Sequence, residues 1–257
     1  MNINNKSIFF DIYGTLAGFY PEREKIQRKI LSKHNIFLSE SQILSGYKEA
    51  DEFMVYQKKV KPLRLMNKNE LQIFFSAYES KILEKNNIFI DKNKTLEIWD
   101  EISKEKYELK IFSDVYENLE YLRDKKIICA GITNMNISGK KLIQDLKLQK
   151  HLEFIITSYD CKSEKPNPKI FEYCLKKSGA KKKNSYLVGD QIESDIKGAK
   201  DFGITPILID RYNHYKEFNL SEKISNLDGL KKNILAHQDN KFTRQKIDRT
   251  HTDEVLI

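Results

Sequence analysis

The sequence contains few of the residues that mark fibrous, low-complexity or secreted proteins. Its 257 residues include only 10 glycines and 5 prolines, which excludes collagen-like and mucin-like chains. No run of about 18 apolar residues occurs, so the sequence predicts no transmembrane helix. The first residues lack the basic, apolar and small-residue regions of a secretory signal peptide. We therefore expect a globular protein with no membrane partner that stays in the cytoplasm.

Cysteine is also scarce, and its three occurrences follow no pairing or metal-binding pattern. Cys129, Cys161 and Cys174 are widely spaced and form no C-x-x-C pair. No histidine is patterned near them, and two lie in apolar stretches, where a free thiol is usually a small core residue. The cysteines therefore predict neither disulfides nor a catalytic thiol, which fits a reducing compartment.

Positive charge exceeds negative charge, but it is not concentrated in one segment. The formal net charge is +8, and the lysines are scattered among acids apart from short clusters such as residues 181–183. A nucleic-acid groove would need basic residues gathered along one face. We interpret the lysines as a solvated surface, and no nucleic-acid partner is predicted. No pattern in the sequence indicates an oligomeric state.

Strand-length apolar segments alternate with amphipathic segments through most of the chain. The apolar segments are residues 7–12, 127–133, 154–157, 186–188 and 206–209, and the helical-period segments are residues 115–125, 139–148, 169–178 and 192–202. Nearly continuous apolar strands are typical of a sheet covered on both faces. The alternation predicts the α/β class, with a Rossmann-like parallel sheet built from right-handed crossovers.

Residues 21–106 interrupt this alternation with four amphipathic stretches and no convincing strand. Ser39 with Gln42, and Asn69 with Gln72, have the spacing of helix N-caps followed by a glutamine three residues later. We predict that an all-helical unit, residues 17–107, is inserted into an α/β core formed by residues 1–16 and 108–236. Residues 237–257 are polar and are predicted to form a mobile tail.

Polar residues follow the predicted strands at one end. In an open parallel sheet, ligands bind beyond the carboxyl ends of the strands. The residues at those ends are Asp11, Thr15, Thr133, Asn134, Lys165, Asp190 and Asp195. Several carboxylates beside a lysine suit a hard divalent cation that holds an anionic substrate.

Four motifs at these strand ends resemble those of the haloacid dehalogenase-like (HAD) hydrolase superfamily. In chain order they are FFDIYGTL, GITN, SEKPNPKIF and LVGDQIESD, and the resemblance runs from residue 5 to about residue 209. The inserted helical unit resembles the all-helical cap of this family. The resemblance implies a hydrolase with a Rossmann-like core and a helical cap.

The resemblance also implies catalytic roles. Asp11 would be the nucleophile that attacks phosphorus and forms an aspartyl-phosphate. Thr133 would hydrogen-bond the transferring group, and Lys165 would neutralise charge between Asp11 and the phosphate. Thr15 and Asn134 would be partners of these groups, although both residue types also cap turns without any catalytic role.

A metal site is implied by the same motifs. Asp190 would bind Mg²⁺ directly, with Asp195 as a further ligand or as a support for the ligands. Asp11 would contribute its carboxylate, and Tyr13 would contribute its backbone carbonyl. Mg²⁺ is therefore the expected cofactor.

Tyr13 departs from the pattern of the family's phosphatases, which carry an aspartate there as general acid and base. A phenol has a pKa near 10 and is a poor base for water at neutral pH. The Asp-x-Tyr-Gly-Thr motif is similar to that of the 2-haloacid dehalogenases, whose aspartate displaces halide from carbon without a metal. Members of the REG-2-like group combine an unusual residue at this position with an intact fourth motif.

The rest of the sequence favours phosphate chemistry over dehalogenation. Asp190 and Asp195 form a fourth motif of the metal-binding type, and residues 42–49 contain no arginine to hold a substrate carboxylate. We therefore expect a Mg²⁺-dependent phosphatase acting on a small phosphorylated metabolite. Two alternatives stay open: a 2-haloacid dehalogenase-type hydrolase with a halogenated substrate, and a module that binds phosphate and Mg²⁺ without useful turnover.

Overall fold

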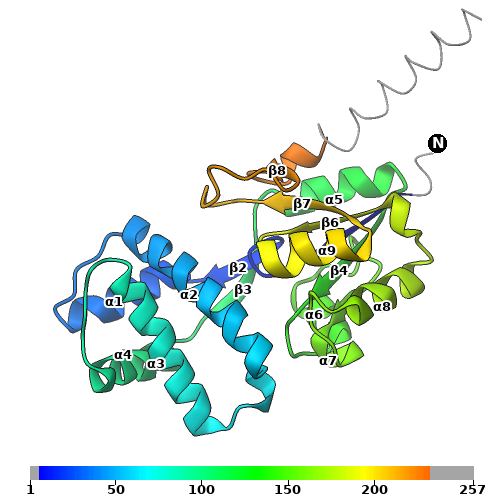
Figure 1. Ribbon diagram of the computed structural model, residues 1–257. Helices are drawn as coiled ribbons and strands as arrows, with labels where there is room; N and C mark the ends of the chain where they lie inside the picture. The colour runs from blue at the N-terminus through cyan, green and yellow to red at the C-terminus, as the bar shows by residue number, and fades with distance from the viewer. Residues whose placement is uncertain (1–5, 232–257) are drawn as a thin grey trace, which may run out of the picture. The chain divides into compact units, whose positions relative to one another are not determined.

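The computed structural model describes residues 6–231, and the chain separates into two units (Figure 1). Of the described residues, 6–16 and 111–231 form the first unit, and 17–110 form the second. The sequence places the end of the inserted unit at residue 107. The difference of a few residues arises because a strand beginning at Glu108 pairs within the inserted unit. The predicted mobile tail, residues 237–257, lies outside the described residues.

The first unit is built on a six-stranded sheet whose strand pairs are all parallel, in the order β5-β4-β1-β6-β7-β8. The strands are β1 (Ser7–Phe10), β4 (Ile128–Thr133), β5 (Ile155–Thr157), β6 (Ser185–Gly189), β7 (Thr205–Ile209) and β8 (Glu222–Ile224). Every residue of the central strand β1 is buried, as expected for a strand between two neighbours and beneath two covered faces. The predicted α/β class is confirmed, and the short edge strand β8 is an addition to it.

Helices connect these strands. They are α5 (Val115–Asp124), α6 (Gly139–Asp145), α7 (Ser158–Cys161), α8 (Pro168–Ser178), the 3₁₀ turn η3 (Lys182–Asn184), the π-helical turn η4 (Ile192–Lys197) and α9 (Gly198–Phe202). Helix α8 begins with Asn167 as N-cap and Pro168 in its first turn, and its C-cap is Gly179, which has a φ of 68°. The stretch 192–202, expected as one helix, begins as the wider π turn that carries Asp195.

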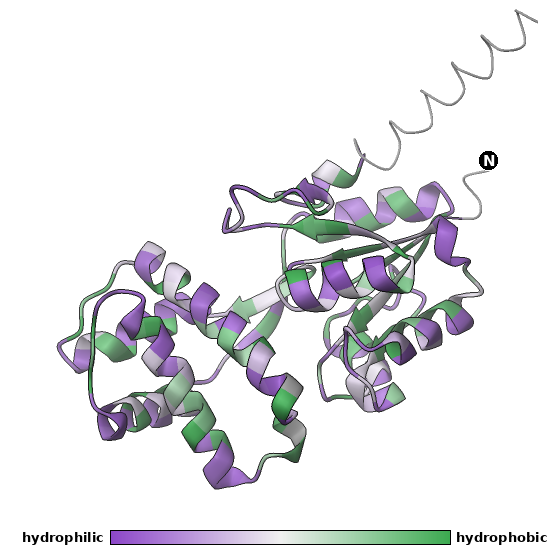
Figure 2. Ribbon diagram, in the orientation of Figure 1, coloured by the Kyte–Doolittle hydropathy of each residue, from purple (hydrophilic) through white to green (hydrophobic). Residues whose placement is uncertain are grey.

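Apolar residues of the strands and helices form one core between them. Phe9, Ile170 and Phe171 are fully buried in it. Figure 2 shows mainly hydrophobic strands in the sheet, whereas the helices carry both kinds of residue. All three cysteines are buried thiols, where the sequence predicts burial for two, and burial raises the pKa of Cys129 to about 12. Such thiols stay protonated and unreactive near neutral pH.

The second unit contains four helices and a two-stranded ribbon. Its elements are β2 (Ala17–Tyr20), α1 (Arg23–Lys33), α2 (Glu40–Val60), the 3₁₀ turn η2 (Leu63–Leu65), α3 (Lys68–Glu84), α4 (Lys92–Lys104) and β3 (Glu108–Ile111). The ribbon pairs β2 with β3. The expectation of an all-helical unit is therefore corrected: the two chain segments that open and close it pair as strands.

Capping residues define where two of these helices begin. Ser39 accepts from the backbone N–H of Gln42 and donates its own to the Gln42 side chain, as the sequence predicts. The other capping box is formed by Asn67 and Glu70 instead of residues 69 and 72. A carboxylate in the first turn also interacts favourably with the helix dipole, which favours the earlier start. Within residues 6–231, every helix is too short or too polar to cross a lipid bilayer.

Candidate active site

Parallel pairing brings three polar strand ends to one edge of the sheet. Strand β1 lies between β4 and β6, with Phe10 in register with residues 131 and 188. Asp11 follows β1 directly, and its N–H donates to Val188 O at 2.9 Å. Thr133 is the last residue of β4, and Asp190 follows the last residue of β6. These three residues therefore lie at the carboxyl edge that the sequence singles out.

Lys165 joins two carboxylates in the interior. Its Nζ lies 2.6 Å from Asp11 Oδ1 and 2.7 Å from Asp195 Oδ1, and it donates to Ile132 O at 3.0 Å. The residue is only 5% exposed. Burial alone lowers the pKa of an ammonium group, but the two carboxylates outweigh it and raise the pKa of Lys165 above its ordinary value. Lys165 is therefore a fixed, buried positive charge.

Asp11 is buried in a site where acids outnumber this one cation. It is 7% exposed, and burial raises its pKa from 3.8 to about 6. Lys165 opposes that rise, whereas the nearby charge of Asp195 adds to it. The raised pKa of Asp11 therefore reflects chiefly its burial, and a cation bound beside its carboxylate would lower that pKa.

Asp11, Asp190 and Asp195 form a group of possible metal ligands. One carboxylate oxygen from each lies within 4.8 Å of the others. Asp195 is fully buried and is anchored through Oδ2, which accepts from the backbone N–H of Gln191 at 3.1 Å. Three carboxylates form a donor set suited to a hard divalent cation.

Two glycines make this close approach of carboxylates possible. Gly14 has a φ of +78°, and a Cβ added there would lie 2.3 Å from Asp190 Oδ2. A Cβ added at Gly189 would lie 2.4 Å from Asp195 Cγ. Any side chain at either position would push an aspartate away. Both glycines are part of the sequence motifs, but the motifs alone do not indicate that the glycines leave space for the aspartates. A glycine next to a motif aspartate is the sequence signal that could have indicated it.

Asn134 holds the segment that carries the lysine. Its Oδ1 accepts from Lys165 N at 2.6 Å, and its Nδ2 donates to Lys165 O at 3.0 Å. This two-point contact links the end of β4 to a loop 31 residues away. Asn134 thus contacts the backbone of Lys165, and its catalytic role stays a prediction.

The remaining predicted residues lie in the turn after β1. Thr15 is fully buried, and its Oγ1 has no hydrogen-bond partner among the described residues. Its carbonyl accepts two hydrogen bonds from Arg211, a residue that no sequence motif indicates. Tyr13 is partly exposed, two residues after Asp11. Both residues thus flank Gly14, whose backbone lies against Asp190.

Comparison with known proteins identifies the family. Residues 39–209 match the haloacid dehalogenase-like hydrolases. The chain belongs to this family. The matched segment includes Lys165, Asp190 and Asp195, and it begins after Asp11 and the first strand.

Two relatives of this hydrolase share about a third of their aligned residues with it. The rhythmically expressed gene 2 protein of Drosophila melanogaster is 34% identical over 85 residues, covering 32% of this chain and 33% of that protein. The glyceraldehyde 3-phosphate phosphatase of Methanopyrus kandleri is 31% identical over 105 residues, covering 40% and 45%. The chain therefore spans less than half the length of these relatives.

Solved structures show that the fold is common to phosphatases and dehalogenases. A HAD phosphatase from Thermococcus onnurineus matches with a TM-score of 0.54 and 24% identity, covering 90% of this chain and 97% of that one. A 2-haloacid dehalogenase from Pseudomonas syringae matches with a TM-score of 0.52 and 19% identity, covering 91% and 99%. The fold of this hydrolase does not choose between them, so the choice rests on the side chains.

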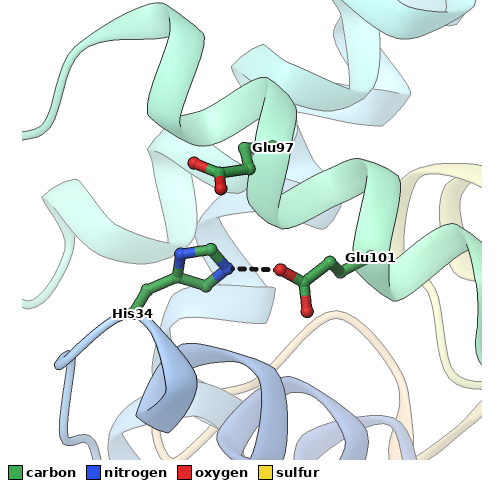
Figure 3. A group of neighbouring side chains, drawn as sticks. All are labelled: His34, Glu97 and Glu101. Carbon is green, nitrogen blue, oxygen red and sulfur yellow. Dashed lines mark hydrogen bonds and ion pairs between the residues drawn. The ribbon is translucent and has the colours of Figure 1, made fainter.

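A second group of possible ligands lies in the helical unit of the hydrolase (Figure 3). His34 Nε2 lies 2.9 Å from Glu101 Oε1, and Glu97 lies one turn earlier on α4. Each glutamate is already neutralised, since Lys33 pairs with Glu101 at 3.1 Å and Lys94 pairs with Glu97 at 2.8 Å. We interpret this group as an ion-pair network that joins the end of α1 to α4.

Proposed function

We propose that this hydrolase is a Mg²⁺-dependent phosphatase that acts on small phosphorylated metabolites. The observation that carries the proposal is the convergence of Asp11, Asp190 and Asp195 within 4.8 Å, beside a lysine that contacts two of them. A dehalogenase that works without a metal has no use for such an acidic group. The similarity to a protein named as a phosphatase supports the same choice.

The residues present fit Mg²⁺. Asp11 and Asp190 would hold the ion through carboxylate oxygens, and Tyr13 would add its backbone carbonyl. Asp195 would support them, because its two oxygens contact Lys165 and the N–H of Gln191. When bound, Mg²⁺ neutralises charge on the phosphate oxygens and so permits attack by an anionic carboxylate.

Asp11 would act as the nucleophile. One of its carboxylate oxygens attacks phosphorus, and the bond between phosphorus and the leaving oxygen breaks, with the electron pair leaving on that oxygen. Lys165 holds the attacking carboxylate in place and offsets the charge of the phosphate. Water then attacks phosphorus in the aspartyl-phosphate, the bond to Asp11 breaks, and the carboxylate is restored as phosphate leaves.

Tyr13 should affect formation and hydrolysis of the aspartyl-phosphate differently. A phenol with a pKa of about 10 is acidic enough to protonate an alkoxide leaving group, but it is a poor base for water. We therefore expect hydrolysis of the aspartyl-phosphate to be the slow step. A slow enzyme and the third alternative, a module without useful turnover, then differ in whether any phosphate is released.

A phosphate-release assay tests the proposal. Wild-type protein is assayed on a panel of phosphomonoesters with Mg²⁺ and with EDTA, beside Asp11→Asn and Asp190→Asn. Asp145→Asn, on the exposed end of α6 where it pairs with Lys141, is the matched control. We expect release that requires Mg²⁺ and Asp11, is reduced in Asp190→Asn, and is unchanged in the control.

Either of two results would reject the proposal. The first is the absence of phosphate release from every ester. The second is halide release from 2-haloacids that continues in EDTA and in Asp190→Asn, which would establish the dehalogenase alternative.

A further inference from the structure

Arg211 contacts the α/β unit at two places: where the chain leaves this unit for the helical unit, and where it returns. It lies just after β7, and its Nε and Nη2 donate to Thr15 O at 3.1 and 2.7 Å. Its guanidinium carbon lies 4.2 Å from the centre of the Phe112 ring. The unit's first segment ends at Leu16 and its second begins at Ile111, so both contacts fall within two residues of a crossing point.

The guanidinium is itself held in place. Its Nη1 lies 3.1 Å from Asp114 Oδ2, and the two side chains are 11% and 13% exposed. The same carboxylate oxygen accepts from the backbone N–H of Leu227 at 2.7 Å. An arginine with all three nitrogens engaged and a buried carboxylate behind it is a rigid anchor, unlike a solvated surface arginine.

The contact at Thr15 bears on the proposed metal site. The turn that follows Asp11 is closed by Thr15 N and Leu16 N, which both donate to Ile12 O, at 3.3 and 2.9 Å. This turn contains Tyr13 and Gly14. Asp190 lies so close to Gly14 that no Cβ fits at that position. A shift of the Thr15 carbonyl would therefore move the neighbouring Gly14, whose backbone lies against the Asp190 carboxylate.

We propose that Arg211 is a positioning residue for the phosphatase site. It acts through the carbonyl of Thr15. It holds the turn that would supply the Tyr13 carbonyl in a fixed position relative to Asp11 and Asp190. It touches neither substrate nor metal, and the inference rests on the proposed function. A purely structural arginine would change stability without changing Mg²⁺ affinity.

The test compares Arg211→Met, Arg211→Lys and a control, Arg123→Met. Arg123 is an exposed arginine of α5 in the same unit that donates to Lys150 O, so its loss leaves the site intact. For each folded variant, Mg²⁺ binding is measured by calorimetry, and kcat and KM are measured on the best phosphomonoester. Loss of a residue that orients metal ligands typically costs about 10- to 100-fold in metal affinity or activity.

We expect Arg211→Met to weaken Mg²⁺ binding and to lower kcat, each by about 10- to 100-fold, while KM changes less. Arg211→Lys should recover part of both losses, because a lysine keeps the charge but cannot donate from three nitrogens. If Arg211→Met does not fold, Asp114→Asn provides the measurement, since it replaces the charged carboxylate that holds the guanidinium with a neutral amide of the same shape.

Several results would overturn the proposal or separate it from the proposed function. A folded Arg211→Met with Mg²⁺ affinity and kcat equal to those of the control overturns it. A wild-type protein that binds no Mg²⁺ overturns it together with the proposed function. If wild-type protein binds Mg²⁺ but hydrolyses no ester, the phosphatase is rejected, and weaker Mg²⁺ binding in Arg211→Met still supports the positioning role.

Discussion

A buried glutamate in the helical unit should make stability depend on pH. Glu79 of α3 is 1% exposed, and its Oε2 accepts from Gln27 Nε2 at 2.6 Å. Burial raises its pKa from 4.5 to about 7, against the opposing effect of the Gln27 hydrogen bond. Glu79→Gln replaces the acid with a group of the same shape that keeps an oxygen for Gln27.

The size of the effect follows from the two pKa values. Below about pH 4.5 the carboxyl is protonated in both the folded and unfolded states, and its ionisation costs nothing. As pH rises, the unfolded chain ionises first, so the folded state loses stability until pH exceeds about 7. At about 1.4 kcal/mol per pKa unit, the full loss is on the order of 3 kcal/mol. The gain in Glu79→Gln should therefore grow by about 2–3 kcal/mol between about pH 5 and pH 8.

Urea unfolding followed by tryptophan fluorescence measures this difference. The chain has 1 tryptophan, Trp99 of α4, which stacks on Phe75 with ring centres 4.1 Å apart and so reports on the helical unit. Glu84→Gln is the control, because Glu84 lies on the same helix, pairs with Lys81 and has a side chain that is 40% exposed. A free-energy difference between Glu79→Gln and wild type that stays constant from about pH 5 to pH 8 would refute the reasoning.

Three further variants test single contacts of the site. Gly14→Ala should abolish Mg²⁺-dependent phosphate release, because its Cβ would lie 2.3 Å from Asp190 Oδ2; wild-type activity would refute this packing argument. Tyr13→Asp should raise steady-state turnover by about 10²- to 10⁴-fold, because it supplies a base for water, and a slower variant would show that another step limits. Lys165→Met should lose about 3–5 kcal/mol of stability in urea unfolding, because two buried acids lose their cation; unchanged stability would contradict that pairing.

The sequence predicts those parts of the molecule that depend on local pattern. Apolar runs of strand length identify the five buried strands, and polar residues at or near the ends of three of these runs identify Asp11, Asn134 and Asp190 as candidates at one edge. Parallel pairing then requires these residues to lie near one another. This reasoning works because the order of strands along the chain and the direction of the sheet are both readable from residue periodicity.

The parts that the sequence does not predict depend on contacts between distant residues. Strands β2 and β3 are four residues each and are separated by the whole helical unit, so neither shows a pattern of its own. Arg211 contacts a carbonyl 196 residues earlier, and a backbone carbonyl leaves no trace in a sequence. The sequence places the second capping box two residues too late, because Asn67 and Asn69 are both followed three residues later by a suitable partner.

The central claim is that Asp11 carries the phosphoryl group, and trapping that intermediate tests it most directly. Because Tyr13 should make its hydrolysis slow, the aspartyl-phosphate should accumulate when wild-type protein turns over a phosphomonoester with Mg²⁺. Borohydride reduces an acyl phosphate to an alcohol, so acid quenching followed by reduction and peptide mass spectrometry should find homoserine in place of Asp11. Modification of another residue, or phosphate release with Asp11 unmodified at every time point, would contradict the account.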